Sequence, residues 1–244
     1  MEANTWTPGQ TLISVVDRPR QAFAQIVSRP GRGWFLPVLI LLLGLATLNL
    51  ALAPHAAVEA RKQLESQLAS LPPAQANALT ERMGTFSSPL FVGAMGFAMG
   101  ILGTVVAILL GAAILYFIGL VVGGEGEFGP TLAATLWAWI PFGLRPLVQA
   151  AVIAAQGRPI VNQGLAYLVS VGDPIKDAQN MLYGLLAQVD LFGLWHLVLV
   201  FAAALALQKA GRDKALLVTL LYGAISLGLR VGVVLVQRLF MPAL

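Results

Sequence analysis

Three charged side chains stand inside or at the edge of long apolar stretches, where an ionisable group is costly and usually has a specific role. Arg145 and Arg230 lie well inside two of these stretches, and Asp190 stands at the start of another. Helical rise places all three in about the same layer of the membrane, so the economical arrangement pairs Asp190 with one arginine. If the cluster faces a cavity, its chemistry is the passage of a small solute, ion or lipid.

Further polar side chains accompany both arginines at helical spacing. Gln149 follows Arg145 by four residues and Ser226 precedes Arg230 by four, so each pair lies on one helix face. If these two faces meet, they line a small polar cavity that opens outward. The alternative is that both arginines extend to the outer headgroups and hold the helix bundle together.

His196 is the other titratable residue within an apolar stretch, and we interpret it as a hydrogen-bonded packing residue. It lies about 9 Å deeper than Asp190 on the same helix and on a different face. No spacing in the sequence groups Ser, His and Asp, pairs two acids within a span or assembles metal ligands. The absence of cysteine excludes thiol catalysis and zinc ribbons. We therefore expect no enzyme, no metal site and no cofactor.

These residues lie within or beside five long apolar stretches. Each stretch is about as long as, or longer than, the roughly 20 residues that a helix needs to cross a hydrocarbon core. Charged residues make up 11% of the chain, against about 25% in a soluble domain. These features predict an all-α fold, a polytopic membrane bundle of five transmembrane helices with amphipathic or interfacial helices added. The predicted spans are residues 34–53, 90–122, 131–155, 191–207 and 215–236.

The expected organisation is a cytoplasmic amino-terminal segment, residues 1–33, followed by a five-helix membrane domain, residues 34–244. Longer helical connections on the outer side cover about residues 54–89 and 156–189. Basic residues before the first span and in the fourth connection, 208–214, fall on one side of a five-span protein. The positive-inside rule makes that side cytoplasmic, so the carboxyl terminus is expected outside. No cleavable signal peptide is apparent.

Four arginines lie at or near the ends of a predicted amino-terminal helix, residues 19–28, where they suit contact with the headgroups of anionic lipids. The alternative for this helix is that Phe23 and Ile26 pack against the membrane bundle. A nucleic-acid partner is not expected from the net charge of +4, because no dense basic run with interleaved aromatic residues appears. The four arginines are Arg18, Arg20, Arg29 and Arg32.

Small residues recur at every third or fourth position of the second span. Such a stripe lets another helix backbone approach closely, which favours association in lipid. The partner is either a helix of the same chain or a second copy, so a homodimer is one expectation. The small residues are Gly96, Gly100, Gly103, Ala107 and Gly111.

Short stretches along nearly the whole chain resemble the Yip-domain family of five-span membrane proteins, and in particular its prokaryotic members. The resemblance implies five helices, a cytoplasmic amino terminus and no catalysis. It covers the start of the first span, the Gly-Gly turn with the proline of the third span, and the last two helices. The stretches are PRQAF at 19–23, WFLP at 34–37, GGEGEF at 123–128, WIP at 139–141, DLFGLW at 190–195 and KA at 214–215.

Eukaryotic relatives in that family are implicated in vesicle traffic and Rab binding, which they associate with a long amino-terminal region and an Asp-Leu-Tyr-Gly-Pro-like motif. The sequence shows no counterpart of either, so binding of a Rab-type GTPase is not expected. The resemblance instead suggests a protein of a prokaryotic plasma (inner) membrane. The leading hypothesis is a non-enzymatic scaffold or membrane-organising protein. The alternative is a transporter or channel for a small solute, ion or lipid.

Overall fold

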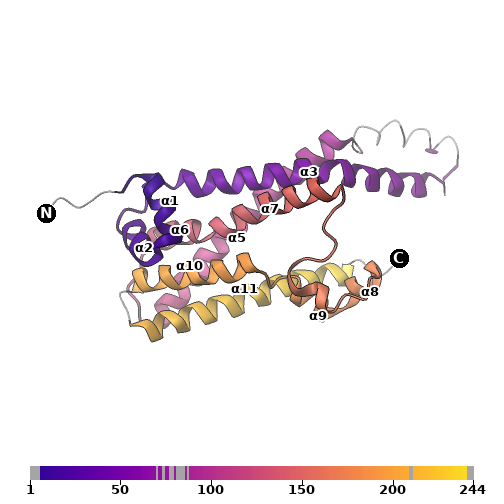
Figure 1. Cartoon of the computed structure of the whole chain (residues 1–244). Coiled ribbons are helices and arrows are strands. Elements are labelled where there is room, and N and C mark those ends of the chain that lie inside the picture. Colours follow the sequence, from indigo (N-terminus) through magenta and orange to yellow (C-terminus); the bar gives the residue numbers. More distant parts are fainter. Residues whose placement is uncertain are drawn as a thin grey trace. The chain divides into compact units, whose positions relative to one another are not determined.

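The fold is taken from a computed structural model that describes residues 6–69, 71–72, 75–76, 80, 86, 88–208 and 211–240. Every regular element within those residues is a helix, which confirms the predicted all-α fold (Figure 1). Among the described helices, four are long and apolar enough to cross a membrane, and one shorter helix is also apolar. The chain is therefore a polytopic helical bundle.

The first long helix, α3 (Phe35–Leu68), continues well beyond the predicted end of the first span at residue 53. Pro54 lies inside the helix and removes one backbone donor without ending it. Strong helix formers, mainly alanine and charged residues, follow this proline and favour continuation. Residues 54–68 of the predicted outer connection thus extend α3, and most of residues 70–87 lie outside the described part.

The second long helix, α5 (Pro89–Val121), begins and ends at residues suited to those positions. Pro89 has no N–H to leave unpaired in the first turn. Gly123 has a φ of 84°, a left-handed conformation that glycine adopts without a steric penalty. The Gly124 N–H then reaches back to the Gly119 carbonyl at 2.9 Å, which closes the end of the helix.

The third predicted span consists of two helices, α6 (Phe128–Ala138) and α7 (Ile140–Gln156), separated at Trp139. The last two predicted spans correspond to the shorter apolar helix α10 (Leu191–Gln208) and the long helix α11 (Arg212–Phe240). Shorter elements lie between α7 and α10 in the predicted second outer connection. They are η1 (Gly164–Leu168), α8 (Pro174–Gln179) and α9 (Met181–Leu186).

The chain divides into two compact units. The first unit comprises residues 1–40, 106–142 and 161–244, and the second comprises residues 41–105 and 143–160. The long helices α3 and α5 each contribute to both units.

In the second unit, helices approach one another at glycines. A Cβ placed on Gly44 of α3 would overlap the backbone oxygen of Gly143 in α7. A Cβ on Gly100 of α5 would lie 3.2 Å from the Leu45 side chain. The glycine stripe of α5 is therefore used here for packing within one chain, and the homodimer stays a prediction.

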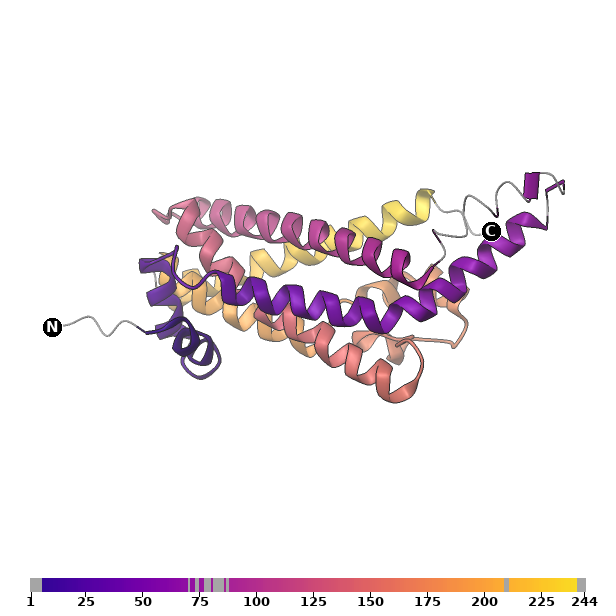
Figure 2. The same cartoon turned by 90° about the horizontal axis from the view of Figure 1, so that it is seen from above.

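In the first unit, an amino-terminal hairpin of α1 (Pro8–Asp17) and α2 (Pro19–Ser28) packs on the bundle. Helix α2 contacts both α6 and α10 (Figures 1 and 2). Its apolar face is buried there through Phe23 and Ile26, while its arginines remain exposed. The packing alternative considered for Phe23 and Ile26 is thus the arrangement found, and it leaves the arginines available to headgroups.

Candidate functional site

The candidate site of the first unit begins where α6 is separated from α7. Pro141 lacks an N–H and its ring disturbs the preceding turn, so a regular helix does not run through this point. The Trp139 N–H bonds to the Thr135 carbonyl at 3.1 Å, and the Phe142 N–H bonds to the Trp139 carbonyl at 2.9 Å. In a regular helix the Phe142 N–H would instead reach the Ala138 carbonyl, which is therefore open to another donor.

His196 of α10 forms a hydrogen bond with that carbonyl. Its Nδ1 lies 2.8 Å from the Ala138 oxygen and its Nε2 lies 3.1 Å from the Tyr222 hydroxyl. A carbonyl only accepts, so the tautomer that satisfies both contacts donates from Nδ1 and accepts at Nε2 from the phenol. With its side chain 4% exposed, His196 links α6, α10 and α11 as a packing residue.

Gly111 of α5 makes room for the tyrosine of this network. A Cβ on Gly111 would lie 3.0 Å from the Tyr222 hydroxyl oxygen, which is too close for an ordinary contact. Of the predicted small-residue stripe, Gly111 therefore serves this cluster, whereas no described atom lies within 4 Å of a Cβ on Gly103. The stripe does not act as one continuous packing face.

Aromatic and cationic groups complete the cluster. The Phe142 ring lies against the His196 ring, with centroids 4.7 Å apart. The guanidinium carbon of Arg230 lies 5.0 Å from the Phe142 centroid, in the range of a cation–π contact. Sequence reasoning missed Phe142 and the Ala138 carbonyl, although Pro141 was the signal that the helix would break beside them.

A groove of about 600 Å³ opens between α10 and α11 next to this cluster. Four of the predicted polar residues line it: Asp190, His196, Ser226 and Arg230. Arg145 and Gln149 belong to the second unit, so their membership of the same cluster stays a prediction.

The groove is long, and its charged side chains, Asp190 and Arg230, lie toward one end, while His196, Tyr222 and Thr219 line it further along. Its lining extends along α11 from Leu216 to Arg230, about 21 Å at the rise of an α-helix. At the start of α10, Asp190 accepts a hydrogen bond from the Gly193 N–H at 2.7 Å and so caps the helix. Between Leu216 and this polar end the walls are mainly leucine, valine and phenylalanine side chains. Such a groove fits an elongated amphiphile better than a hydrated ion.

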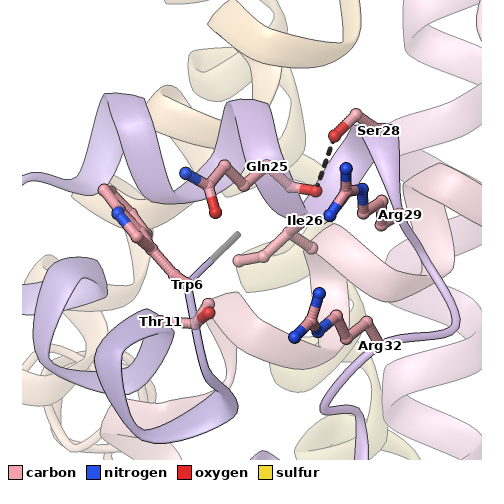
Figure 3. A pocket seen from close by; sticks show the side chains of 7 residues that line it. All are labelled: Trp6, Thr11, Gln25, Ile26, Ser28, Arg29 and Arg32. Carbon is pink, nitrogen blue, oxygen red and sulfur yellow. Dashed lines mark hydrogen bonds between the residues drawn. The ribbon is translucent and has the colours of Figure 1, made fainter. Parts of the chain in front are cut away.

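The four predicted headgroup arginines are all exposed on the first unit, but their surroundings differ. Arg18 forms an ion pair with Asp17 at 3.2 Å. Arg29 and Arg32 line a separate cavity of about 340 Å³ beside the amino-terminal hairpin (Figure 3).

The described residues include no group of three or more His, Cys, Asp or Glu side chains placed to hold a metal ion.

The sequence model of the Yip1 domain matches residues 13–233, which is nearly the whole chain. No curated protein and no solved structure matches the sequence. Together with the long apolar helices, the family match identifies an integral membrane protein.

Proposed function

Because this chain belongs to the Yip1 domain family, which is not known as enzymatic, we propose that it is a non-enzymatic, membrane-organising protein that holds an anionic lipid. The lipid lies in the groove between α10 and α11. Its acyl chain follows the apolar walls, and its phosphate lies at the end that carries Arg230.

The observation that carries this proposal is the division of the groove into a mainly apolar length and an end at which Arg230 stands together with Asp190, whose carboxylate accepts the Gly193 N–H at 2.7 Å. Leu194, Val198 and Leu220 line it and are all more than half exposed, which in a bilayer places them in contact with hydrocarbon. The length of about 21 Å somewhat exceeds one leaflet of a hydrocarbon core that is about 30 Å thick. An acyl chain therefore has room along the groove with its headgroup near Arg230.

The network behind the groove explains how binding would organise lipid. His196 joins three helices through the Ala138 carbonyl and the Tyr222 hydroxyl, so the wall of the groove is held in one arrangement. A ligand in a preorganised site loses less free energy to ordering of the protein. A lipid held on such a wall would exchange more slowly than its neighbours in the bilayer.

The test counts retained lipids. The full chain is reconstituted in nanodiscs that contain phosphatidylglycerol and phosphatidylcholine, and native mass spectrometry counts the lipids that stay bound after detergent release. Arg230→Gln should lower retention of phosphatidylglycerol by about tenfold, because one charge-assisted contact to phosphate is lost. The matched control is Arg212→Gln, an exposed arginine at the other end of α11, which should retain lipid as wild type does.

A second variant tests the apolar wall without touching the charge. Leu220→Trp adds volume to an exposed wall position and should reduce retention of both lipids while leaving thermal stability unchanged. Equal retention by wild type, Arg230→Gln and Leu220→Trp would contradict the proposal. Flux of ions or lipid across liposomes that requires Arg230 would favour the transporter alternative over the organising role.

A further inference from the structure

The amino-terminal hairpin carries a second cavity, which is independent of the groove. It lies between the residues leading into α1 and the carboxyl end of α2. Figure 3 shows the guanidinium groups of Arg29 and Arg32 on one side of the cavity and Trp6 on the other, with Ile26 between them. Two cations from one short segment thus border a common space of about 340 Å³.

The hairpin holds this cavity in a defined shape. Val15 of α1 and Phe23 and Ile26 of α2 are buried, so both helices are anchored by apolar packing. Thr7 and Gln10 form a reciprocal capping box at the start of α1, next to Trp6. The side chains at the rim therefore project from a fixed backbone.

The chemistry of the lining selects an anion. Its described lining residues include no carboxylate, and none of the described residues forms an ion pair with Arg29 or Arg32. The Ser28 hydroxyl already donates to the Gln25 carbonyl at 2.9 Å and the Thr11 hydroxyl to the Thr7 carbonyl at 3.1 Å, so the charged donors of the lining are the two guanidinium groups. Paired guanidinium groups match the geometry of phosphate oxygens.

The position of the cavity identifies the source of the phosphate. Arg32 is followed closely by Trp34 and Phe35, both about half exposed, and α3 begins its apolar course at Phe35. Exposed aromatic side chains at the start of a span mark the interface between headgroups and hydrocarbon. On α1, Ile13 is also exposed and apolar, which suits contact with a bilayer.

We propose that the cavity lined by Arg29, Arg32 and Trp6 is a binding site for the phosphate of an anionic lipid headgroup. Arg18 and Arg20 lie outside it and contribute only a diffuse positive surface. The site does not depend on the groove proposed above, because the two share no lining residue.

The two sites lie near opposite ends of α10. Both belong to the first unit, and Figures 1 and 2 place α2 beside the end of α10 that leads to α11, whereas Asp190 precedes its start. The 18 residues of α10 span about 27 Å. The hairpin therefore binds lipid in the leaflet opposite to that of the groove's polar end, and this is the cytoplasmic leaflet if the amino terminus has its predicted orientation.

The test uses the full chain in phosphatidylcholine nanodiscs that contain a small fraction of spin-labelled phosphatidic acid. Electron paramagnetic resonance measures the fraction of label that the protein immobilises. The double variant Arg29→Gln/Arg32→Gln should bind phosphatidic acid about tenfold more weakly. The matched control Arg18→Gln/Arg20→Gln removes the same charge from the same hairpin and should lower binding by less than about twofold.

Three outcomes decide the proposal. An equal loss in both double variants would overturn it, because binding would then follow net charge rather than the cavity. Displacement of the labelled lipid by millimolar glycerol phosphate would overturn the assignment to a lipid and indicate a soluble phosphate compound. Recovery of part of the binding in Arg29→Lys/Arg32→Lys, together with unchanged binding in Arg230→Gln, would support the site and separate it from the groove.

Discussion

At Gly44 two backbones of the second unit come so close that no Cβ fits between them, whereas at Ala138 two helices of the first unit are joined through the imidazole of His196. The close backbone approach at Gly44 gains dispersion contacts and leaves no space for a ligand at the crossing. The bridge at Ala138 depends on a carbonyl that a broken helix leaves open, and a groove lies beside it. Helices that are bridged by side chains can leave room for a ligand between them, whereas helices in direct backbone contact cannot.

The glycines of α5 make different kinds of contact in the two units. Gly100 lies against Leu45 within the second unit, and Gly111 lies against Tyr222 within the first. The same residue type on one helix therefore serves a tight crossing in one unit and a polar network in the other. A stripe of small residues by itself does not say which.

The largest effect is expected from Gly44→Ala. The new methyl group would overlap the Gly143 backbone oxygen, and backbone atoms cannot move aside as a side chain does. We expect a loss of about 2–3 kcal/mol in the free energy of unfolding, as for overpacked cores. Unfolding of the detergent-solubilised protein by sodium dodecyl sulfate measures it.

Gly103→Ala is the matched control for this prediction. No described atom lies within 4 Å of its Cβ, and alanine is a better helix former than glycine. The free energy of unfolding should stay the same or rise by up to about 1 kcal/mol. If both alanine variants unfold alike, the close approach of the backbones at Gly44 does not contribute to stability as argued.

A medium effect is expected from His196→Phe. The variant leaves the Ala138 carbonyl and the Tyr222 hydroxyl without their partner inside the bundle, which should cost about 1–2 kcal/mol. Tyr222→Phe removes one of the two bonds and should cost less, about 0.5–1 kcal/mol. A double-mutant cycle with the same unfolding assay tests the coupling, and strictly additive losses would show that the two side chains act separately.

The smallest effect is expected outside the spans, in the connection that contains Asp177. Its carboxylate accepts hydrogen bonds from the Ser170 hydroxyl at 2.5 Å and from the Val171 N–H at 2.8 Å. These bonds, that of Ser170 foremost, hold the pKa of Asp177 below its ordinary value of 3.8. The stabilisation is therefore fully present well above pH 3.8 and is lost progressively as the pH falls through 3.8 and then through the lower pKa of the folded chain.

Hydrogen exchange of the amides around Val171 measures this effect. Protection should be constant from neutral pH down to about pH 5 and fall progressively below it, after correction for intrinsic exchange rates. Asp177→Asn should show reduced protection already at neutral pH, with the spans unaffected. Protection that is identical in wild type and variant would show that the Asp177 carboxylate does not stabilise this connection.

Much of the fold was predictable because apolar length in a membrane leaves few alternatives to helices. The boundaries were less so: α3 runs through Pro54, and the third span separates at Trp139. In the site, Asp190, Ser226 and Arg230 line one groove, and helical rise alone had predicted a common depth for Asp190 and Arg230. Phe142 was not predicted, because its place beside Arg230 depends on the local geometry of the break.

The sequence by itself determined that the chain is a helical membrane protein and to which family it belongs, since hydrophobic length is a local property. Only the tertiary structure decided which glycines meet a backbone, that Ala138 offers its carbonyl to His196, and that Arg29 and Arg32 share a cavity while Arg18 pairs with Asp17. These facts depend on the rotation of each helix about its axis and on the path of the chain between helices. Both are set by the packing of side chains far apart in sequence.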